Sequence, residues 1–293
     1  MQRHFADWIR LVSVAGALIF SATASQTTNN REPKPMTPTD LDRLIKTRNW
    51  SAVQLSGQSG PSIVPALEPY LQNSDEVIRL LAVDCIGAAG GPQAPRLLIR
   101  ALADTNEQVR NDAVNALHHN LQPGHESELL AAWDANRARD TYLRQQIPMI
   151  LGLMHANQRI ADLKARLGAD PRQDVKDGII AALAKLGDAP SRDTFGVMLR
   201  DARGKRTADL IELVKYLDEP WVIPYLVPVL QRRDIAIDLS THRKQLMRRE
   251  CDLAVDEVIR ISKAHFSFAV DTTAQYSEAQ INEVLRYAQA QPR

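Results

Sequence analysis

An internal repeat at an offset of 31 residues constrains the fold of this chain more than any other feature of the sequence. Residues 75–86, "DEVIRLLAVDCI", align with residues 106–117, "NEQVRNDAVNAL". The alignment superimposes Arg79 on Arg110, Ala82 on Ala113, Val83 on Val114 and Ile86 on Leu117. A further copy lies at residues 170–183, and a degraded copy at residues 142–153 lies between them. Self-similarity at this period indicates an array of stacked structural units.

Each unit contains two helical patterns. The first, at residues 95–104, places Leu98 and Leu102 four positions apart, on one helix face. The second carries an apolar stripe at the same spacing: Val109, Ala113 and Leu117. Aromatic residues make up only 5% of the chain, which favours helices over sheets. A single two-helix unit leaves apolar surface exposed, whereas stacking several units buries it in a continuous core.

The junction between the two helices of a unit is polar. An Asp or Asn there can cap the second helix by accepting hydrogen bonds from its first N–H groups. We expect Arg79 and Arg110 to lie along the stack and to pair with neighbouring acids or carbonyls. Gly87, Gly90 and Gly91 follow a helix rather than lead into one, so we interpret them as a helix exit and not as a phosphate-binding loop.

The pattern D-x-x-x-x-V-R-x-x-A-V-x-x-L at residues 104–117 resembles the HEAT repeat. It is most similar to the short bacterial subtype named after phycobilisome lyases, within the armadillo-like helical superfamily. The resemblance is strongest over residues 61–120 and returns at 156–187 and 220–262. It implies an all-α fold, a right-handed α-solenoid of about six two-helix HEAT-like repeats with terminal capping helices. It also implies protein binding, with no common catalytic residue.

The two ends of the solenoid carry capping signals. At the N-terminal end, Thr39 with Asp42 three residues on predicts the start of the first helix. At the C-terminal end, Ser277 predicts the start of a last helix whose Ile281 and Ala288 face the stack. The stretch before that helix is expected to be a loop that packs Phe266 or Phe268 on the final repeat.

The first 24 residues have the layout of a secretory signal peptide. Arg3 and Arg10 provide a basic start, residues 11–20 are apolar, and cleavage is expected after Ala24. An uncleaved membrane anchor or a buried helix is the alternative reading. Cleavage would place the protein in the periplasm or outside the cell, in a bacterial cell envelope, without stable membrane insertion.

The mature chain then consists of a flexible leader at residues 25–36 and the HEAT-like α-solenoid at residues 37–293. A basic insertion loop at residues 233–247 interrupts the last repeat. Removing residues 1–24 leaves 34 basic and 34 acidic residues. This balance gives no electrostatic reason to expect binding to nucleic acid or to an anionic membrane surface.

The sequence offers few residues for chemistry. Cys85 and Cys251 lie in distant repeats, on the order of 45 Å apart by helix-layer spacing, which excludes an intramolecular disulfide. Cys85 lies among apolar neighbours, so we expect a packing role rather than a nucleophile. His118, His119 and His125 form the single His cluster. Adjacent histidines on a helix point about 100° apart, so we expect surface residues and no metal site. We predict no catalytic residue and no cofactor.

These features favour an exported HEAT-repeat scaffold, not an enzyme, that binds a protein partner through its concave helix surface. The residues expected on that surface are Asp84, Asn111, Asn115, Gln145 and Asp177. Arg243 and Lys244 join them if the basic insertion contacts the partner; the alternative is that the insertion is a solvated loop. Two other hypotheses remain. One is a lyase-like or chromophore-handling accessory factor, by analogy with the repeat subtype. The other is a structural subunit of an envelope assembly.

Overall fold

The structure is a computed structural model, and it describes residues 37–139, 141–238, 240 and 246–292. These residues belong to one compact unit that spans residues 36–293. The predicted signal peptide and leader lie outside the described residues, as do Arg243 and Lys244. No helix in the described part is long and apolar enough to cross a membrane.

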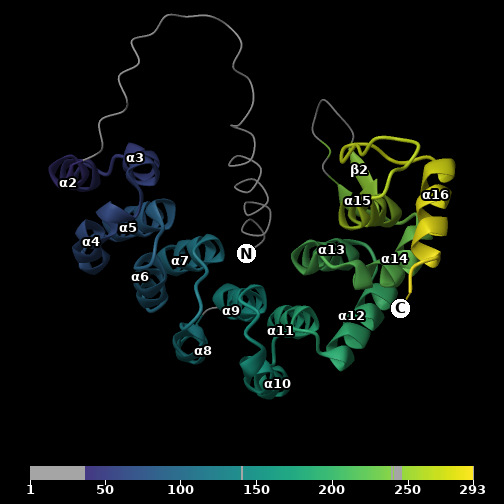
Figure 1. Cartoon of the computed structure of the whole chain (residues 1–293), viewed down its shortest axis with the longest axis horizontal. Coiled ribbons are helices and arrows are strands. Elements are labelled where there is room, and N and C mark those ends of the chain that lie inside the picture. The colour runs from purple at the N-terminus through teal and green to yellow at the C-terminus, as the bar shows by residue number, and fades with distance from the viewer. Residues whose placement is uncertain (1–36, 140, 239, 241–245, 293) are drawn as a thin grey trace, which may run out of the picture. The chain divides into compact units, whose positions relative to one another are not determined.

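Helices build almost all of this unit, and they form six successive pairs within the described residues (Figure 1). The second helices of the pairs are α5 (Glu76–Ala89), α7 (Glu107–His119), α9 (Thr141–Leu153), α11 (Gln173–Lys185), α13 (Lys205–Leu217) and α15 (Glu250–Ser262). The first helices are α4 (Val64–Leu67) continued by η2 (Glu68–Gln72), α6 (Ala94–Ala101), α8 (Glu126–Ala135), α10 (Ile160–Ala169), α12 (Ala189–Asp201) and α14 (Ile223–Leu230). The ends carry α2 (Pro38–Lys46), α3 (Ser51–Ser59) and α16 (Glu278–Gln289).

The helices are arranged in two layers. Each second helix packs against the next, from α5 through α15, and α3 packs on α5. First helices pack in the same way at α6–α8 and at α12–α14, and the C-terminal helix α16 packs on α14. The predicted α-solenoid of about six two-helix repeats with capping helices is therefore confirmed.

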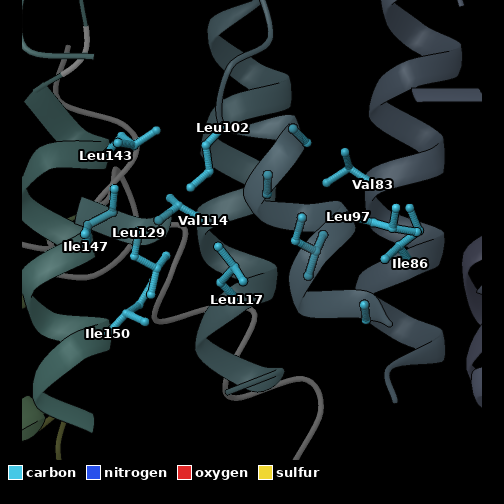
Figure 2. Packing of buried hydrophobic residues seen from close by; sticks show 14 of the residues in the cluster. Val83, Ile86, Leu97, Leu102, Val114, Leu117, Leu129, Leu143, Ile147 and Ile150 are labelled. Carbon is cyan, nitrogen blue, oxygen red and sulfur yellow. The ribbon is translucent and has the colours of Figure 1, made fainter. Parts of the chain in front are cut away.

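The core lies between the two layers and is built from the repeated apolar positions. Figure 2 shows the contributions of three successive second helices to this core: Val83 and Ile86 of α5, Val114 and Leu117 of α7, and Ile147 of α9. Each of these side chains is at most 2% exposed. Stacking thus buries the apolar stripe of every unit against its neighbours, as the 31-residue offset predicts.

The junction residues cap the second helices as expected. Asp75 accepts a hydrogen bond from the N–H of Val77, and Asn106 accepts from the N–H groups of Gln108 and Val109. Ser277 caps α16 in a capping box with Gln280. These bonds satisfy backbone donors that have no partner inside the helix.

The predicted start of the first helix was wrong by two residues. Thr37, not Thr39, is the cap, and it exchanges hydrogen bonds with Asp40 rather than Asp42. Pro38 explains the shift because proline has no N–H and its fixed φ suits the first helical position.

One glycine of the predicted helix exit also has a different role. Gly90 does end α5, with a φ of 65°. Gly87, however, lies inside α5, where an added Cβ would come within 2.8 Å of the Cβ of Ala116. Gly87 therefore lets α5 and α7 approach closely, and the exit begins only at Gly90.

Arginines join successive repeats as predicted. The Arg79 guanidinium donates to both carboxylate oxygens of Asp104 in the next unit, at 2.7 and 2.9 Å, and to the carbonyl of Asn73 at 2.9 Å. Arg110 donates to the carbonyl of Asp104 at 2.8 Å. Arg144 pairs with Asp170 in the same forward direction. Arg79 and Arg144 therefore meet the junction of the following unit, whereas Arg110 donates to the carbonyls of Asp104 and Thr105 at the junction of its own unit.

The basic insertion is not an unstructured loop in its described part. Strands β1 (Ile235–Asp238) and β2 (Met247–Arg249) form an antiparallel hairpin with Ile237 opposite Arg248 and a register shift beside it. No strand was predicted here because strands of four and three residues are too short for an alternation of apolar and polar residues to be recognised.

Candidate functional site

The candidate site is the side of the second-helix layer that faces away from the first helices, called here the second-helix surface. It is formed by α5, α7, α9, α11, α13 and α15. The five predicted partner-binding residues in the described part lie on these helices. They occupy the seams between adjacent second helices, and two of them, Asn115 and Asp177, make side-chain hydrogen bonds within the chain.

Two of the five are buried, contrary to the expectation that they face a partner. Asp177 of α11 is 2% exposed and accepts hydrogen bonds from Arg206 of α13 at 2.8 Å and from Gln173 at 2.9 Å. Asn111 of α7 is 3% exposed, and its Oδ1 has no hydrogen-bond partner among the described residues. The sequence pattern missed this because positions between stripe residues point toward the neighbouring second helix rather than outward.

Asn115 is half-buried and makes an inter-repeat bond. Its Oδ1 accepts from the Tyr142 hydroxyl of α9 at 2.6 Å. His118, one turn further along α7, lies 3.0 Å from the side-chain oxygen of Gln146 on the same neighbouring helix. Tyr142 and Gln146 were not predicted as site residues. Their partners lie 27 and 28 positions earlier in the chain, so only the structure reveals these contacts.

Asp84 and Gln145, like the buried Asn111, make no side-chain hydrogen bond to any described residue. Asp84 of α5 is half-buried, and Asp112 of α7 lies near enough to act on its charge. Burial, and secondarily the negative charge of Asp112, raises the pKa of Asp84 to about 7. The surface between α5 and α7 thus holds a carboxyl group that exchanges its proton near neutral pH.

The raised pKa of Asp84 should make the stability of the fold depend on pH. Asp84 binds its proton more tightly in the folded chain than in the unfolded chain, where the pKa is about 3.9, so its ionisation opposes folding. As the pH rises from about 4 to 7, its contribution should lower the free energy of unfolding by about 2 kcal/mol, allowing for solvent screening.

Asp84→Asn should remove this contribution, so the variant should exceed the wild type in stability at pH 8 but not at pH 4. Urea denaturation across this pH range measures the difference. An Asp162→Asn control on α10, in the first-helix layer, should leave the wild-type profile unchanged. Parallel curves for the wild type and Asp84→Asn would contradict the assignment.

The histidine cluster is only partly at the surface. His119 is exposed and His125 lies 3.0 Å from Glu128, but burial lowers the pKa of His118 to about 4. His118 is therefore neutral at pH 7, and its contact with Gln146 joins α7 to α9. No group of three potential ligands for a metal ion occurs among the described residues.

Both cysteines are fully buried and neither forms a disulfide, as predicted. Burial raises the pKa of the Cys85 thiol to about 11, and that of Cys251 in the same direction. Neither thiol should react with a water-soluble reagent in the folded protein, whereas both should react in urea. Rapid labelling of Cys85 without denaturant would contradict its placement in the core.

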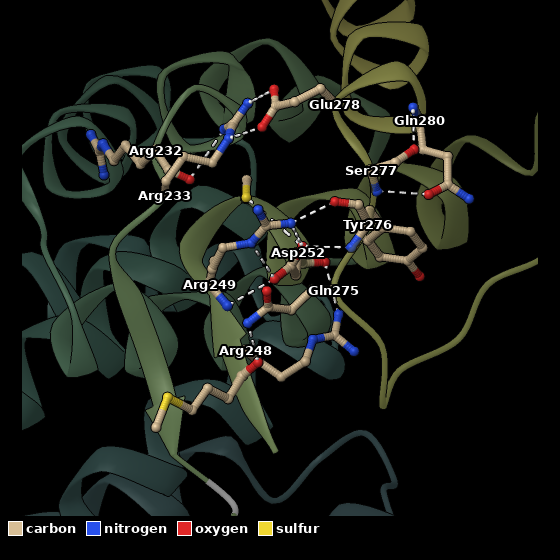
Figure 3. A network of polar contacts seen from close by, with 12 residues as sticks. Arg232, Arg233, Arg248, Arg249, Asp252, Gln275, Tyr276, Ser277, Glu278 and Gln280 are labelled. Carbon is tan, nitrogen blue, oxygen red and sulfur yellow. Dashed lines mark hydrogen bonds and ion pairs between the residues drawn. The ribbon is translucent and has the colours of Figure 1, made fainter. Parts of the chain in front are cut away.

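Arg233 of the basic insertion and Arg249, which follows the insertion in β2, bind within the chain, as Figure 3 shows. Arg233 donates to both carboxylate oxygens of Glu278, at 2.7 and 2.6 Å. Arg249 donates to both oxygens of Asp252, at 3.0 and 2.8 Å, and to the carbonyl of Tyr276. In its described part the insertion is a hairpin rather than a solvated loop, and a partner contact there stays a prediction. Asp252 and Glu278, which bind Arg249 and Arg233, hold the hairpin to α15 and α16. Arg243 and Lys244 lie outside the described residues, and their role stays a prediction.

A surface cavity of about 380 Å³ lies elsewhere, at the edge formed by the junction loops of the first two repeats. Arg79, Arg100 and Asp104 are among its lining residues. Arg79 is bound to Asp104 and Arg100 to Glu68, so the charged groups of this cavity are already neutralised in pairs.

Three comparisons place this architecture among known proteins. The family described as HEAT repeats matches residues 42–118. The bilin biosynthesis protein PecE of Nostoc sp. (strain PCC 7120) is 23% identical over 171 residues, which cover 57% of this chain and 68% of PecE. The solved complex of CpcE and CpcF of phycocyanin lyase from Nostoc sp. PCC7120 contains a chain with a TM-score of 0.52 and 13% identity. That match covers 91% of this chain and 100% of the other, and at this identity it shows the fold alone. Residues 42–118 therefore carry HEAT repeats, and the six stacked helix pairs continue the same two-helix architecture through the described part of the chain.

Proposed function

We propose that this protein is an accessory factor that binds a linear tetrapyrrole of the bilin type on its second-helix surface and works together with a protein partner. The likeness to a bilin biosynthesis protein and to a subunit of a phycocyanin lyase complex supports the proposal. Chromophore handling, the alternative expected from the repeat subtype, thereby takes precedence over a scaffold that binds proteins alone.

The half-buried Asp84 carboxyl is the observation of this chain that carries the proposal. A linear tetrapyrrole presents a row of pyrrole nitrogens that donate hydrogen bonds and can carry a proton. Asp84 has acceptor oxygens without a hydrogen-bond partner in the described part, and a pKa of about 7 lets it take up or release that proton. Asp112 on the neighbouring α7 and the amide of Gln145 on α9, one second helix further along, provide further polar groups of the same surface.

The chain's part in the reaction is binding and orientation of the tetrapyrrole. A covalent intermediate on its own thiols is not proposed, because both sulfur atoms are buried and the pKa of each thiol is raised. The expectation that the chain is not an enzyme is therefore restricted to covalent catalysis by its own thiols. We propose that the chain contributes to a lyase-type assembly as the subunit that holds the chromophore.

Titration of the full-length protein with biliverdin, followed by visible absorbance, tests the proposal. Binding should change the absorbance band in a saturable way, and Asp84→Asn should weaken the affinity at least tenfold. The matched Asp162→Asn variant on α10 should bind as the wild type does. A protein that captures a protein partner but leaves the biliverdin spectrum unchanged would refute chromophore binding and support the scaffold alternative.

We further propose that residues 1–24 direct export, on the grounds of their basic start, apolar run and small-residue end. N-terminal sequencing of the protein from its native cell should begin at Ser25. A chain that retains Met1 in a cytoplasmic fraction would refute export without bearing on the tetrapyrrole proposal.

A further inference from the structure

One contact in the second-helix layer skips a repeat. The Tyr216 hydroxyl of α13 donates a buried hydrogen bond of 2.9 Å to the carbonyl of Met149 on α9, 67 residues earlier. Helix α11 lies between these two helices in the stack, since it packs on both. The polar links described above, such as Asn115 with Tyr142, join adjacent second helices instead.

Glycines make this contact possible. A Cβ on Gly178 of α11 would lie 2.6 Å from the carbonyl oxygen of Gln145, so its absence lets α9 and α11 approach closely. A Cβ on Gly152 of α9 would overlap the Tyr216 Oη and lie 3.3 Å from the Cα of Ala182. The hydroxyl of Tyr216 therefore occupies the space that a side chain at position 152 would take.

Helix α11 supports the same residue from the other side. Lys185, at its last turn, donates to the carbonyls of Tyr216 and Leu217 at 3.1 and 2.8 Å, and its Nζ lies 5.3 Å from the centroid of the Tyr216 ring. Ile180, Ala181 and Ala184 of α11 belong to the same buried cluster as Met149 and Tyr216. They are at most 7% exposed although they lie in the layer that forms the second-helix surface.

We infer that Tyr216 is a lock that fixes the spacing of α9 and α13 across α11. It keeps the α11 part of the second-helix surface closed. The surface is thereby divided into one stretch formed by α5, α7 and α9 and another formed by α13 and α15. This inference goes beyond the proposed function and does not depend on it.

A double-mutant cycle at Gly152 and Tyr216 tests the lock in the full-length protein. Gly152→Ala should force Tyr216 out and accelerate amide exchange in α9 and α13 at least tenfold. Tyr216→Phe removes the atom that the new Cβ would overlap, leaving a contact of 3.3 Å to the ring Cζ that a small shift relieves. The double variant should therefore exchange as Tyr216→Phe alone does. Gly168→Ala on α10, where nothing lies within 4 Å of the added Cβ, is the matched control.

Rescue by the second substitution is the decisive outcome. If Gly152→Ala does not fold but the double variant does, the lock is supported. If the double variant is as disturbed as Gly152→Ala, or if Gly152→Ala exchanges like the wild type, the lock is overturned. Tyr216→Ala should also increase binding of an apolar fluorescent dye, because it uncovers α11. Unchanged dye binding would overturn the claim that Tyr216 closes this part of the surface.

Discussion

Replacing Arg144 by alanine is expected to lower the free energy of unfolding by about 3–5 kcal/mol, because it leaves a buried carboxylate without its partner. The side chains of Arg144 and Asp170 are 5% and 0% exposed, so neither charge is solvated by water. Arg144 also lies 5.7 Å from the centroid of the Trp133 ring, whose Nε1 donates to the Arg144 carbonyl at 2.8 Å. Urea denaturation followed by circular dichroism measures the loss.

The matched control is Arg100→Ala. Arg100 forms the same kind of inter-repeat ion pair with Glu68, but the two side chains are 41% and 48% exposed. Solvent screening reduces such a pair to about 1 kcal/mol or less. Equal losses in the two variants would mean that burial does not determine the strength of these links, contrary to the account of the stack given above.

The second large effect is expected in the C-terminal part of the chain. There Arg249→Ala should lower the free energy of unfolding by about 3 kcal/mol. Asp252 is 0% exposed, and its burial would by itself raise its pKa. Hydrogen bonds from Arg249 and from the N–H groups of Arg249 and Tyr276 outweigh burial and hold the pKa of Asp252 below its usual range. The substitution removes the guanidinium that joins Asp252 to the segment before α16.

The loss should be local, which distinguishes it from that of Arg144→Ala. Amide exchange should accelerate in residues 250–292 while α5 and α7 keep their protection. Arg233→Ala is the control, since its pair with Glu278 is 36% and 63% exposed and should matter little. Uniform loss of protection along the whole chain would contradict the view that the hairpin arginines serve only the last repeat.

The depressed pKa of Asp252 adds a pH signature to this prediction. Its stabilising contribution is present above the unfolded pKa of about 3.9 and is lost as the pH falls through the lower folded value. The difference in stability between the wild type and Arg249→Ala should therefore shrink below about pH 4. A difference that stays constant down to pH 2 would exclude Asp252 as the group that Arg249 stabilises.

Local and periodic features were predictable from the sequence. Val83, Val114 and the arginines Arg79 and Arg110 recur at a fixed offset, so the burial of the valines and the position of the arginines beside helix junctions follow from stacking alone. The first helix begins two residues before the predicted start only because Pro38 suits the first helical position, and this signal is also local. In each case the determining neighbours lie within one repeat length.

Features that depend on contacts between distant, non-equivalent positions were not predictable. Arg233 and Glu278 are 45 residues apart, and no equivalent pair occurs among the described residues of the other repeats, so the hairpin arginines could not be assigned partners. Tyr216 lies two second helices away from Met149. Of the candidate site, Asp84 could be proposed from its place between stripe positions, but the burial of Asp177 depends on Arg206, which no local pattern identifies.

Hydrogen exchange of the full-length protein with and without biliverdin tests the central claim most directly, because it locates the ligand as well as detecting it. Saturating biliverdin should slow exchange in α5, α7 and α9, around Asp84 and Gln145, and should leave α12 and α14 in the first-helix layer unchanged. No change in exchange anywhere, or protection confined to the first-helix layer, would contradict tetrapyrrole binding on the second-helix surface.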